Sequence, residues 1–264
     1  MQIGNYFKNI NFRHKKHFFS GLSFKSSNCK KNSIFFAIKG NNSDGSKFIK
    51  DAIKKGARTI ISNSKFQGIK NQVLFIKSNK PRELLSKLSS KIYSDKPKNL
   101  VAVTGTNGKS SIADFYTQIL RLNKIKVASI GTLGIKTDSY NLKTENTTLD
   151  PISLNQQLQK FKKLNINNVI LEASSHGLKQ NRLDGLKFKS GIFTNLSHDH
   201  LDYHKSYKDY FESKLILFKK LLKKNASIIT DSDISQYKKI KSIANKKNYR
   251  ICTIGKLDND LKII

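Results

Sequence analysis

The stretch Leu100–Ser111, LVAVTGTNGKSS, decides the fold of this chain. Its apolar start, Leu100–Val103, predicts a buried parallel strand, and the spacing of the apolar residues after Ser110 predicts a helix. A glycine-rich turn lies between them. A strand, a glycine turn, a Lys-Ser pair and a helix are the layout of a phosphate-binding loop. The residues of this predicted nucleotide site are Gly105, Thr106, Asn107, Gly108, Lys109, Ser110 and Ser111.

Each part of this loop has a chemical role. Glycines let backbone N–H groups turn toward an anion, and the N-terminus of the helix adds partial positive charge. Lys109 would reach a terminal phosphate, and the Ser110 hydroxyl would ligate Mg²⁺. The general motif has four residues between its glycines, whereas this chain has two, with Val103 in place of the outer glycine. An ordinary glycine-containing turn between a strand and a helix is therefore the alternative interpretation.

The chain is strongly basic. Its 264 residues include 50 Lys and Arg against 18 Asp and Glu, a net charge of +32, which would suit nucleic acid, a membrane surface or an anionic substrate. The lysines are spread along the whole chain, and Asn and Ile are also abundant, which is typical of codon bias toward A and T. We therefore expect no specific nucleic-acid partner.

Cysteine usage and the apolar runs indicate the compartment. Cys29 and Cys252 are the only cysteines and lie far apart, so a reducing environment fits. The N-terminus has no apolar core of signal-peptide length, and no run approaches the ~18 apolar residues of a membrane span. We expect a cytoplasmic protein without a membrane partner.

Predicted strands and helices alternate along the chain, which indicates an α/β fold. We expect a small N-terminal α/β domain over residues 1–95 and, over residues 96–264, a central domain with a mostly parallel sheet, like that of P-loop ATPases. In the first domain, the predicted strands are 33–38, 58–62 and 73–76, and the predicted helices are 48–55 and 81–93. In the second, the predicted strands are 101–104, 127–130, 169–172, 191–194, 227–230 and 250–254, and the predicted helices are 110–122, 151–164, 207–223 and 234–245.

Polar residues follow several of these strands at their carboxyl ends, where such sheets bind ligands. Glu172 ends an apolar strand and could hold Mg²⁺, or could be a solvated acid at the strand end. His176 could orient a substrate or cap the following turn, and the sequence favours neither. Residues 198–204 contain three histidines and two aspartates, a pattern that suggests a metal site. Histidine ligands would favour zinc over magnesium, but no cysteine supports zinc.

Lys214 shares a predicted helical face with Tyr210, Phe211 and Leu215. A lysine among apolar neighbours has a lowered pKa and becomes a nucleophile. A lysine on a basic helix can instead extend its amine into solvent. The spacing alone favours the second interpretation.

Four segments together resemble the Mur ligases of peptidoglycan synthesis. They are TGTNGKSS (104–111), NTTLDP (146–151), LEASSHGLKQNRLDG (171–185), and FTNLSHDHLDYH with SYKDYFESKLILF (193–204 and 206–218). Their order and spacing also fit, and the short glycine loop is the form that this family uses. The chain is most similar to the members that extend UDP-MurNAc-L-Ala-D-Glu by a third residue, and the resemblance runs through essentially the whole chain.

The resemblance implies an ATP-dependent amide ligase. ATP would phosphorylate the D-Glu side-chain carboxylate, and the amine of a diamino acid would then attack the acyl phosphate, giving an amide, ADP and phosphate. Fixed cations would supply most of the catalysis. Carried over by motif, the catalytic residues are Lys109, His200 and Lys214. One Mg²⁺ would bind Ser110, and a second would bind Glu172, His200 and a carbamylated Lys214.

The resemblance also implies substrate contacts. Carried over by motif, these are Thr147 and Thr148 of a Thr-Thr pair, and Ser174, Gln180 and Arg182, which would grip the dipeptide end. The guanidinium of Arg182 suits a carboxylate, since its fork can bind both oxygens. The N-terminal domain would bind UDP-MurNAc, with Ser27 and the loop 40–49 among its contacts.

The chain departs from the family in three places. Ser26-Ser27-Asn28 replaces the usual Asp-Ser-Arg, which puts the contacts of the missing Asp and Arg in doubt, and Leu149 replaces a proline. The family has a third, C-terminal domain that closes over ATP and selects the acceptor. We expect this chain to be truncated within the central domain and to lack that third domain. Its acceptor could be meso-diaminopimelate or L-lysine, and we favour diaminopimelate as the commoner one. We also expect a monomer.

Two other functions fit parts of the sequence. Folylpolyglutamate synthases share the glycine loop, but they have Gly-Lys-Gly-Ser where this chain has GKSS (108–111), and the segment SSHGLKQNR argues against them. A non-catalytic remnant that only binds nucleotide or UDP-sugar fits the truncation. The presence of Lys109, Glu172, His200 and Lys214 argues against long decay.

Overall fold

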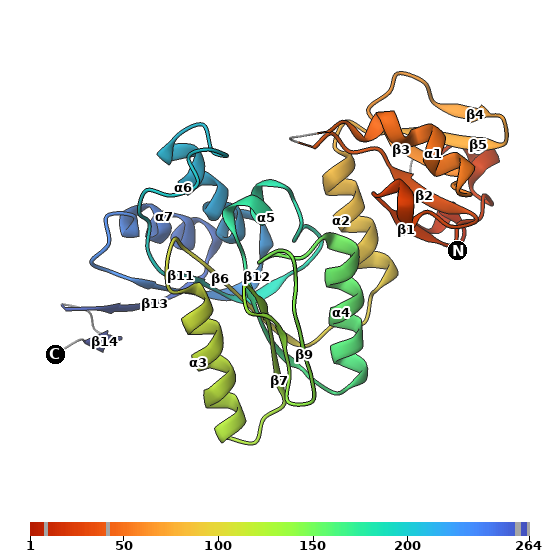
Figure 1. Ribbon diagram of the computed structural model, residues 1–264. Helices are drawn as coiled ribbons and strands as arrows, with labels where there is room; N and C mark the ends of the chain where they lie inside the picture. Colours follow the sequence, from red (N-terminus) through yellow and green to blue (C-terminus); the bar gives the residue numbers. More distant parts are fainter. Residues whose placement is uncertain (8–9, 41–42, 257–259, 263–264) are drawn as a thin grey trace. The chain divides into compact units, whose positions relative to one another are not determined.

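The computed structural model describes residues 1–7, 10–40, 43–256 and 260–262. The chain divides into two compact units, Met1–Ile92 and Tyr93–Ile264 (Figure 1). Each unit contains a sheet dominated by parallel strand pairs and accompanied by helices, so the predicted α/β fold class is confirmed. No helix in the described ranges is long and apolar enough to cross a membrane.

The first unit contains a five-stranded sheet in the order β1-β2-β3-β5-β4. Its strands are β1 (Gly21–Ser23), β2 (Ser33–Phe36), β3 (Thr59–Ser62), β4 (Gly68–Lys70) and β5 (Val73–Lys77), and its helices are α1 (Ile49–Lys54) and α2 (Pro81–Ile92). Among the strands that the structure describes in this unit, only β4 and β5 form an antiparallel pair. Phe35, Ala52 and Ile60 are buried in its core, which is why these short strands and α1 hold together. The predicted substrate loop 40–49 includes residues 41–42, which lie outside the described residues.

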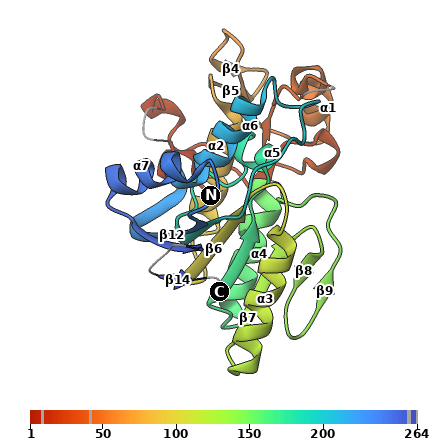
Figure 2. The same ribbon diagram turned by 90° about the vertical axis from the view of Figure 1, so that its left-hand side faces the viewer.

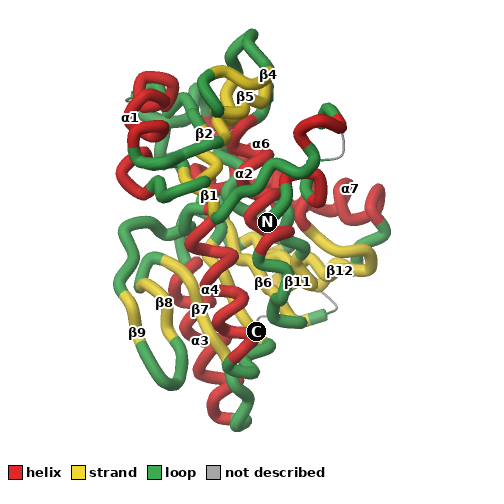
Figure 3. Tube along the Cα trace, turned by 90° about the vertical axis from the view of Figure 1, so that its right-hand side faces the viewer, coloured by secondary structure: helices red, strands yellow, loops and turns green. Residues whose placement is uncertain are grey.

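The second unit contains a nine-stranded sheet in the order β14-β13-β12-β11-β6-β10-β7-β8-β9. Its strands are β6 (Asn99–Thr104), β7 (Val127–Gly131), β8 (Gly134–Lys136), β9 (Asn141–Leu142), β10 (Asn168–Glu172), β11 (Phe188–Phe193), β12 (Leu222–Asp231), β13 (Arg250–Gly255) and β14 (Leu261–Lys262). Its helices are α3 (Lys109–Leu122), α4 (Pro151–Lys163), α5 (Ser175–Lys179), α6 (Tyr207–Ile216) and α7 (Tyr237–Lys247). All pairs are parallel except those of β8, which forms antiparallel pairs at one edge (Figures 2 and 3).

Alternate residues of the central strands face opposite sides of this sheet. Val101 and Val103 of β6 pack with Ala113 of α3 on one face. Leu100 and Ala102 belong to the larger core on the other face, which α4, α6 and α7 cover. Figure 1 shows α3 on one side of the sheet and α6 and α7 on the other. The carboxyl ends of β6, β7, β10 and β11 therefore meet at one edge, where the loops that follow them gather.

Local signals explain where the helices near this edge begin. The Asp150 side chain accepts hydrogen bonds from the N–H groups of Ile152 and Ser153, and Pro151 is the first residue of α4. The Ser174 hydroxyl likewise accepts from the N–H of Gly177 at the start of α5. Ser206 caps α6 in the same way.

The structure corrects two predicted helices. The helix predicted over 207–223 ends as an α-helix at Ile216, continues as a π-helical turn, η5 (Leu217–Leu221), and gives way to β12 at Leu222. The apolar residues of η5 face the core. Their spacing therefore continues the apolar pattern of α6, although the backbone changes there from the α-helical to the wider π-helical form. The helix predicted over 234–245 begins at Tyr237 and ends at Lys247, after which Asn248 adopts a left-handed conformation (φ 52°).

Candidate active site

The loop between β6 and α3 has the strand, glycine turn and helix that its sequence predicts. Gly105 and Gly108 have φ of 149° and 79°, values that disfavour other residues. A Cβ atom at Gly105 would lie 1.8 Å from the Thr194 hydroxyl oxygen, so a side chain cannot be accommodated there. The first N–H groups of α3 have no acceptor within the helix, and they lie directly after this turn. The loop therefore provides an anion-binding helix terminus.

The segment after β11 holds this loop in shape. The N–H of Thr106 donates to the carbonyl of Asn195 (3.0 Å), and the N–H of Asn107 donates to the Asn195 side chain (3.0 Å). The Thr194 hydroxyl donates to the carbonyl of Asn107 (2.6 Å), and the N–H of Ser197 donates to the Thr106 hydroxyl (3.0 Å). The conformation of the phosphate loop is thus fixed by hydrogen bonds from the segment that follows β11.

Two lysines donate to one carbonyl oxygen of the loop. The Nζ atoms of Lys109 and Lys214 lie 3.0 and 2.7 Å from the oxygen of Gly105, and Lys109 also donates to the carbonyl of Thr106 (2.7 Å). Lys214 on α6 is only 1% exposed, so the interpretation that its amine extends into solvent is wrong. Burial, and then the charge of Lys109, lowers the pKa of Lys214 to about 7. Burial also lowers the pKa of Lys109.

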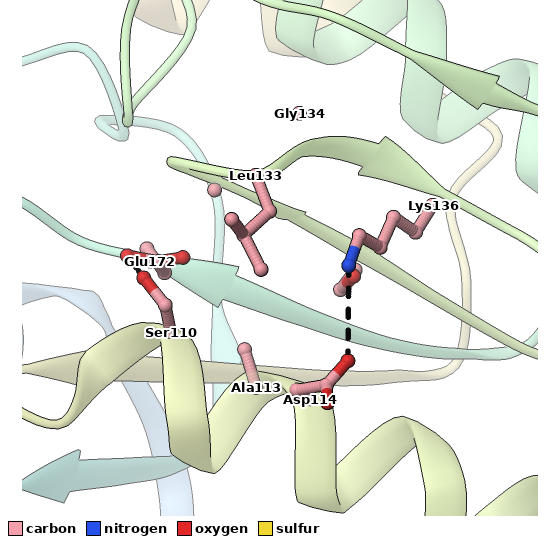
Figure 4. Close-up of a pocket in the computed structure, with 9 residues that line it drawn as sticks. Ser110, Ala113, Asp114, Leu133, Gly134, Lys136 and Glu172 are labelled. Carbon is pink, nitrogen blue, oxygen red and sulfur yellow. Dashed lines mark hydrogen bonds and ion pairs between the residues drawn. The ribbon is translucent and has the colours of Figure 1, made fainter.

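Glu172, at the end of β10, points its carboxylate at the start of α3 (Figure 4). It is 2% exposed and accepts hydrogen bonds from the Ser110 hydroxyl (3.0 Å) and from both the N–H and the hydroxyl of Thr132 (3.1 Å each). Within the described residues, no lysine or arginine forms an ion pair with it. A buried carboxylate beside a hydroxyl, with neutral donors only, suits a hard divalent cation. Ser110 and Glu172 therefore fit Mg²⁺.

A small pocket opens beside this pair, between α3 and the β7–β8 turn (Figure 4). Asp114 of α3 and Lys136 of β8 approach each other across it, with 3.8 Å between Oδ1 and Nζ. Arg121 and Asp138 form a second ion pair between the helix and the hairpin (2.6 Å). The turn that carries Thr132 is thus anchored to the helix that carries Ser110.

His200 lies in the loop after β11 with a left-handed backbone (φ 54°). Its Nε2 is 3.4 Å from the Asp199 carboxylate, and its ring centroid is 4.9 Å from that of His176. His176 in turn lies against the ring of Tyr203 (4.0 Å). Across the described part of the chain, no group of three or more His, Cys, Asp or Glu side chains could hold a metal ion. The expectation of a site built from the histidines and aspartates of 198–204 alone is therefore wrong.

His204 accounts for part of that correction. It is 1% exposed, with Nε2 3.0 Å from the Ser175 hydroxyl and Nδ1 3.6 Å from the Asp209 carboxylate, so it ties α5 to α6 instead of facing the loop. Burial, and then the charge of Lys179, lowers its pKa to about 4, so the ring is neutral near pH 7. No sequence pattern indicated this role of His204.

The residues predicted to bind the dipeptide end are brought together. The Thr148 hydroxyl lies 2.9 Å from the carbonyl of Glu172 and 3.0 Å from the Ser174 hydroxyl. Arg182 donates to the carbonyl of Thr148 (2.6 Å) and, through two nitrogens, to the Gln180 side chain (3.0 and 2.8 Å). Thr147 lies one residue away, with its hydroxyl 3.0 Å from that of Thr132. Ser27 lies in the first unit, on the turn η3 (Ser26–Asn28), and its hydroxyl donates to the Asn28 side chain (3.2 Å).

Sequence reasoning missed Thr132. Its signal is positional: it directly follows β7, in the same sheet and at the same edge as Glu172. The chain around it, Gly131 to Gly134, forms a tight turn between two short strands, which the pattern of apolar residues did not distinguish from a loop.

Comparison with known families matches both units. Residues 19–93 match the family described as "Mur ligase family, catalytic domain", and residues 103–263 match the "Mur ligase middle domain". The UDP-N-acetylmuramoyl-L-alanyl-D-glutamate--2,6-diaminopimelate ligase of Rickettsia montanensis is 40% identical over 253 residues, which are 94% of this chain and 52% of the relative. The ligase of the same name from Chelativorans sp. is 37% identical, over 92% of this chain and 50% of the relative. The chain thus spans about half the length of these curated relatives.

Solved structures of two ligases are also similar to this chain. A structure of a UDP-N-acetylmuramoyl-L-alanyl-D-glutamate--2,6-diaminopimelate ligase has a TM-score of 0.83 and 27% identity, over 99% of this chain and 53% of that one. The MurF ligase of Thermotoga maritima, in complex with ADP, has a TM-score of 0.56 and 20% identity, over 90% of this chain and 50% of that one. At that identity, the second likeness concerns the fold alone.

Proposed function

Because the chain belongs to the Mur ligase family, we propose that it serves ATP-dependent amide-bond formation on a peptidoglycan precursor. The substrate would be UDP-MurNAc-L-Ala-D-Glu, and the acceptor a diamino acid. The names of the similar ligases support both, and they favour 2,6-diaminopimelate over L-lysine. The observation that carries the proposal is the convergence of Lys109, Lys214 and the Ser110–Glu172 pair on one glycine loop.

The proposed reaction has two steps. In the first, an oxygen of the D-Glu side-chain carboxylate attacks the γ-phosphorus of ATP, the bond to the bridging oxygen breaks, and ADP leaves. In the second, the acceptor amine attacks the acyl carbon, phosphate leaves with the electron pair of the C–O bond, and the amine loses a proton. Negative charge develops first on phosphoryl oxygens and then on a tetrahedral intermediate.

The residues of the loop have roles in these steps. The first turn of α3 and the ammonium of Lys109 would hold the ATP phosphates and stabilise the charge on the transferred group. Arg182, held by Gln180 and the carbonyl of Thr148, would direct a carboxylate of the dipeptide toward the loop. The dipeptide would also contact the hydroxyls of Thr147, Thr148 and Ser174. Ser27, in the first unit, would contact UDP-MurNAc.

Mg²⁺, when bound, would neutralise phosphate oxygens. Ser110 would hold one ion, and Glu172, His200 and a modified Lys214 would hold a second. The buried amine of Lys214 supports this modification, because a pKa of about 7 leaves much of it neutral at pH 7. The neutral nitrogen would attack the carbon of CO₂ and lose one proton, giving a carbamate anion. That anion would replace an ammonium group with the oxygen ligand that Mg²⁺ prefers.

Product mass tests the proposal. The purified chain is incubated with ATP, Mg²⁺ and UDP-MurNAc-L-Ala-D-Glu, and with meso-diaminopimelate or L-lysine in separate reactions. We expect a product heavier by one residue, dependent on ATP and lost in Lys109→Ala. If no product forms with either acceptor while UDP-MurNAc-dipeptide still binds, the chain binds the substrate without ligating it, and the proposed reaction is contradicted.

A further inference from the structure

Thr132 lies where the proposed metal site and the proposed dipeptide site meet. It is the first residue of the two-residue turn between β7 and β8, whose flanking glycines, Gly131 and Gly134, pair with each other. Gly134, which follows the turn, has a φ of 90°, a left-handed conformation that favours glycine. The turn is anchored to α3 by the Asp114–Lys136 ion pair. Thr132 is solvent-exposed, although the carboxylate that it contacts is buried.

Thr132 holds both oxygens of Glu172. Its N–H donates to Oε1 and its hydroxyl to Oε2, each at 3.1 Å, and the Ser110 hydroxyl reaches Oε2 from the other side. A Cβ atom at Gly131 would lie 2.0 Å from Oε1, so the absence of a side chain there makes room for this contact. The carboxylate is therefore fixed in position and rotation by residues of β7, α3 and the turn.

The hydroxyl of Thr132 also contacts Thr147, with 3.0 Å between the two Oγ1 atoms. An ionised carboxylate only accepts hydrogen bonds, and Thr132 has one hydroxyl proton. Both contacts are satisfied when Thr147 donates to Thr132 and Thr132 donates to Glu172. The neighbouring Thr148 donates to the main-chain carbonyl of Glu172. The Thr-Thr pair thus reaches the Glu172 side chain through Thr132 and contacts the Glu172 backbone directly.

From this chain of hydroxyls we infer that Thr132 is a positioning residue that couples the metal site to the dipeptide site. The inference deepens the proposed function and rests on it. A cation on Glu172 polarises the Thr132 and Thr147 hydroxyls. When Thr147 gives its one proton to a dipeptide carboxylate, Thr132 loses that donor and becomes a weaker donor to Glu172, whose oxygens are then freer to bind a cation. Each ligand therefore tightens the binding of the other by the same factor, as linkage requires.

The test uses binding to the full chain, without turnover. Mn²⁺ replaces Mg²⁺ as a paramagnetic probe, and electron paramagnetic resonance of free Mn²⁺ gives its affinity with ADP present. Calorimetry gives the affinity for UDP-MurNAc-L-Ala-D-Glu, with ADP and either Mn²⁺ or EDTA. Thr132→Val removes the hydroxyl but keeps the N–H and the branched shape, and Thr132→Ser keeps the hydroxyl. Thr144→Val is the matched control, because its hydroxyl donates to nearby main-chain carbonyls, those of Gly131 (3.4 Å) and Asn146 (3.3 Å).

We expect Thr132→Val to weaken Mn²⁺ binding by ~10-fold or more, in the range for groups that orient a metal ligand. The gain in dipeptide affinity that Mn²⁺ gives in the wild type should vanish in this variant. Thr132→Ser and Thr144→Val should both retain that gain. A merely structural role would lower the urea midpoint of Thr132→Val and leave the gain unchanged.

Thr132→Val with wild-type Mn²⁺ affinity, or with the gain intact, would overturn the inference while leaving the proposed function standing. A wild-type chain that binds neither Mn²⁺·ADP nor the nucleotide-linked dipeptide would overturn both. The two failures are distinguishable because the second is seen in the unmodified chain.

Discussion

At the scale of single residues, burial changes the pKa of ordinary side chains, and the proposed chemistry depends on that change. Lys214 is an unremarkable residue in a basic sequence, yet its amine is enclosed and shares the carbonyl of Gly105 with a second ammonium group, that of Lys109. Both effects favour the neutral amine. The sequence showed that Lys214 has apolar neighbours on its helix, but the helix alone could not show which loop covers its end.

The lowered pKa of Lys214 predicts a carbamate near neutral pH. A lysine with its usual pKa of about 10 is almost wholly protonated at pH 7 and does not attack CO₂, whereas Lys214, with a pKa of about 7, becomes neutral as pH rises through that value. With ¹³C-labelled CO₂ at constant dissolved concentration, we expect a carbamate resonance that is already present near pH 7 and is absent in Lys214→Arg. A resonance that survives in Lys214→Arg, or that grows only near pH 10, would contradict this.

His204 predicts a pH dependence of stability. Its pKa of about 4 in the folded chain is below the usual 6.5, so the unfolded chain binds more protons between these values. The contribution of the neutral ring to folding is fully present above pH ~6.5 and is lost as pH falls toward 4, at up to about 1.4 kcal/mol per pH unit. His204→Gln should flatten the pH dependence of the unfolding free energy in this window, measured by urea denaturation. Equal slopes in the variant and the wild type would refute it.

At the scale of elements, the sequence predicted where helices occur more reliably than it predicted which of their faces are buried. The apolar spacing in α3 predicted a helix correctly, but Phe115 and Ile119, which contribute to that spacing, are 60% and 59% exposed. The small residues Ala113 and Thr117 face the sheet instead, because the helix packs closely on it. The π-helical end of α6 and the short β8–β9 hairpin were missed for a related reason: tertiary packing fixes them, and local periodicity does not.

Two substitutions compare a buried helix face with an exposed one. Leu158→Ala in α4 removes a side chain that is 0% exposed and leaves a cavity, so we expect a loss of ~2–5 kcal/mol in the free energy of unfolding. Ile119→Ala in α3 removes an exposed one, and we expect a change within ~0.5 kcal/mol. Urea denaturation followed by circular dichroism measures both. A loss of several kcal/mol for Ile119→Ala would mean that something covers α3 in solution.

At the scale of the whole molecule, the fold class followed from the alternation of strands and helices, and the phosphate loop followed from its own twelve residues, 100–111. The candidate site was less accessible to sequence reasoning, because Thr132, Glu172 and Ser110 meet only through the order of the strands. That order places β10 between β6 and β7, and no local pattern encodes it. The phosphate-loop motif supplied Ser110 and the strand-end position supplied Glu172, but neither these signals nor the resemblance to a family supplied the roles of Thr132 and the buried His204.

The division into two units predicts how a nucleotide affects unfolding. Each unit has a hydrophobic cluster of its own, and the phosphate loop belongs only to Tyr93–Ile264. A ligand that binds one folded unit stabilises that unit alone, by about 2.7 kcal/mol at 100 times its Kd. In calorimetry, ADP with Mg²⁺ should therefore raise the transition of the second unit and leave that of Met1–Ile92 in place, and Lys109→Ala should reduce the shift. If ADP raised both transitions equally, the units would unfold as one cooperative structure, and if it raised neither, the phosphate loop would not be a nucleotide site.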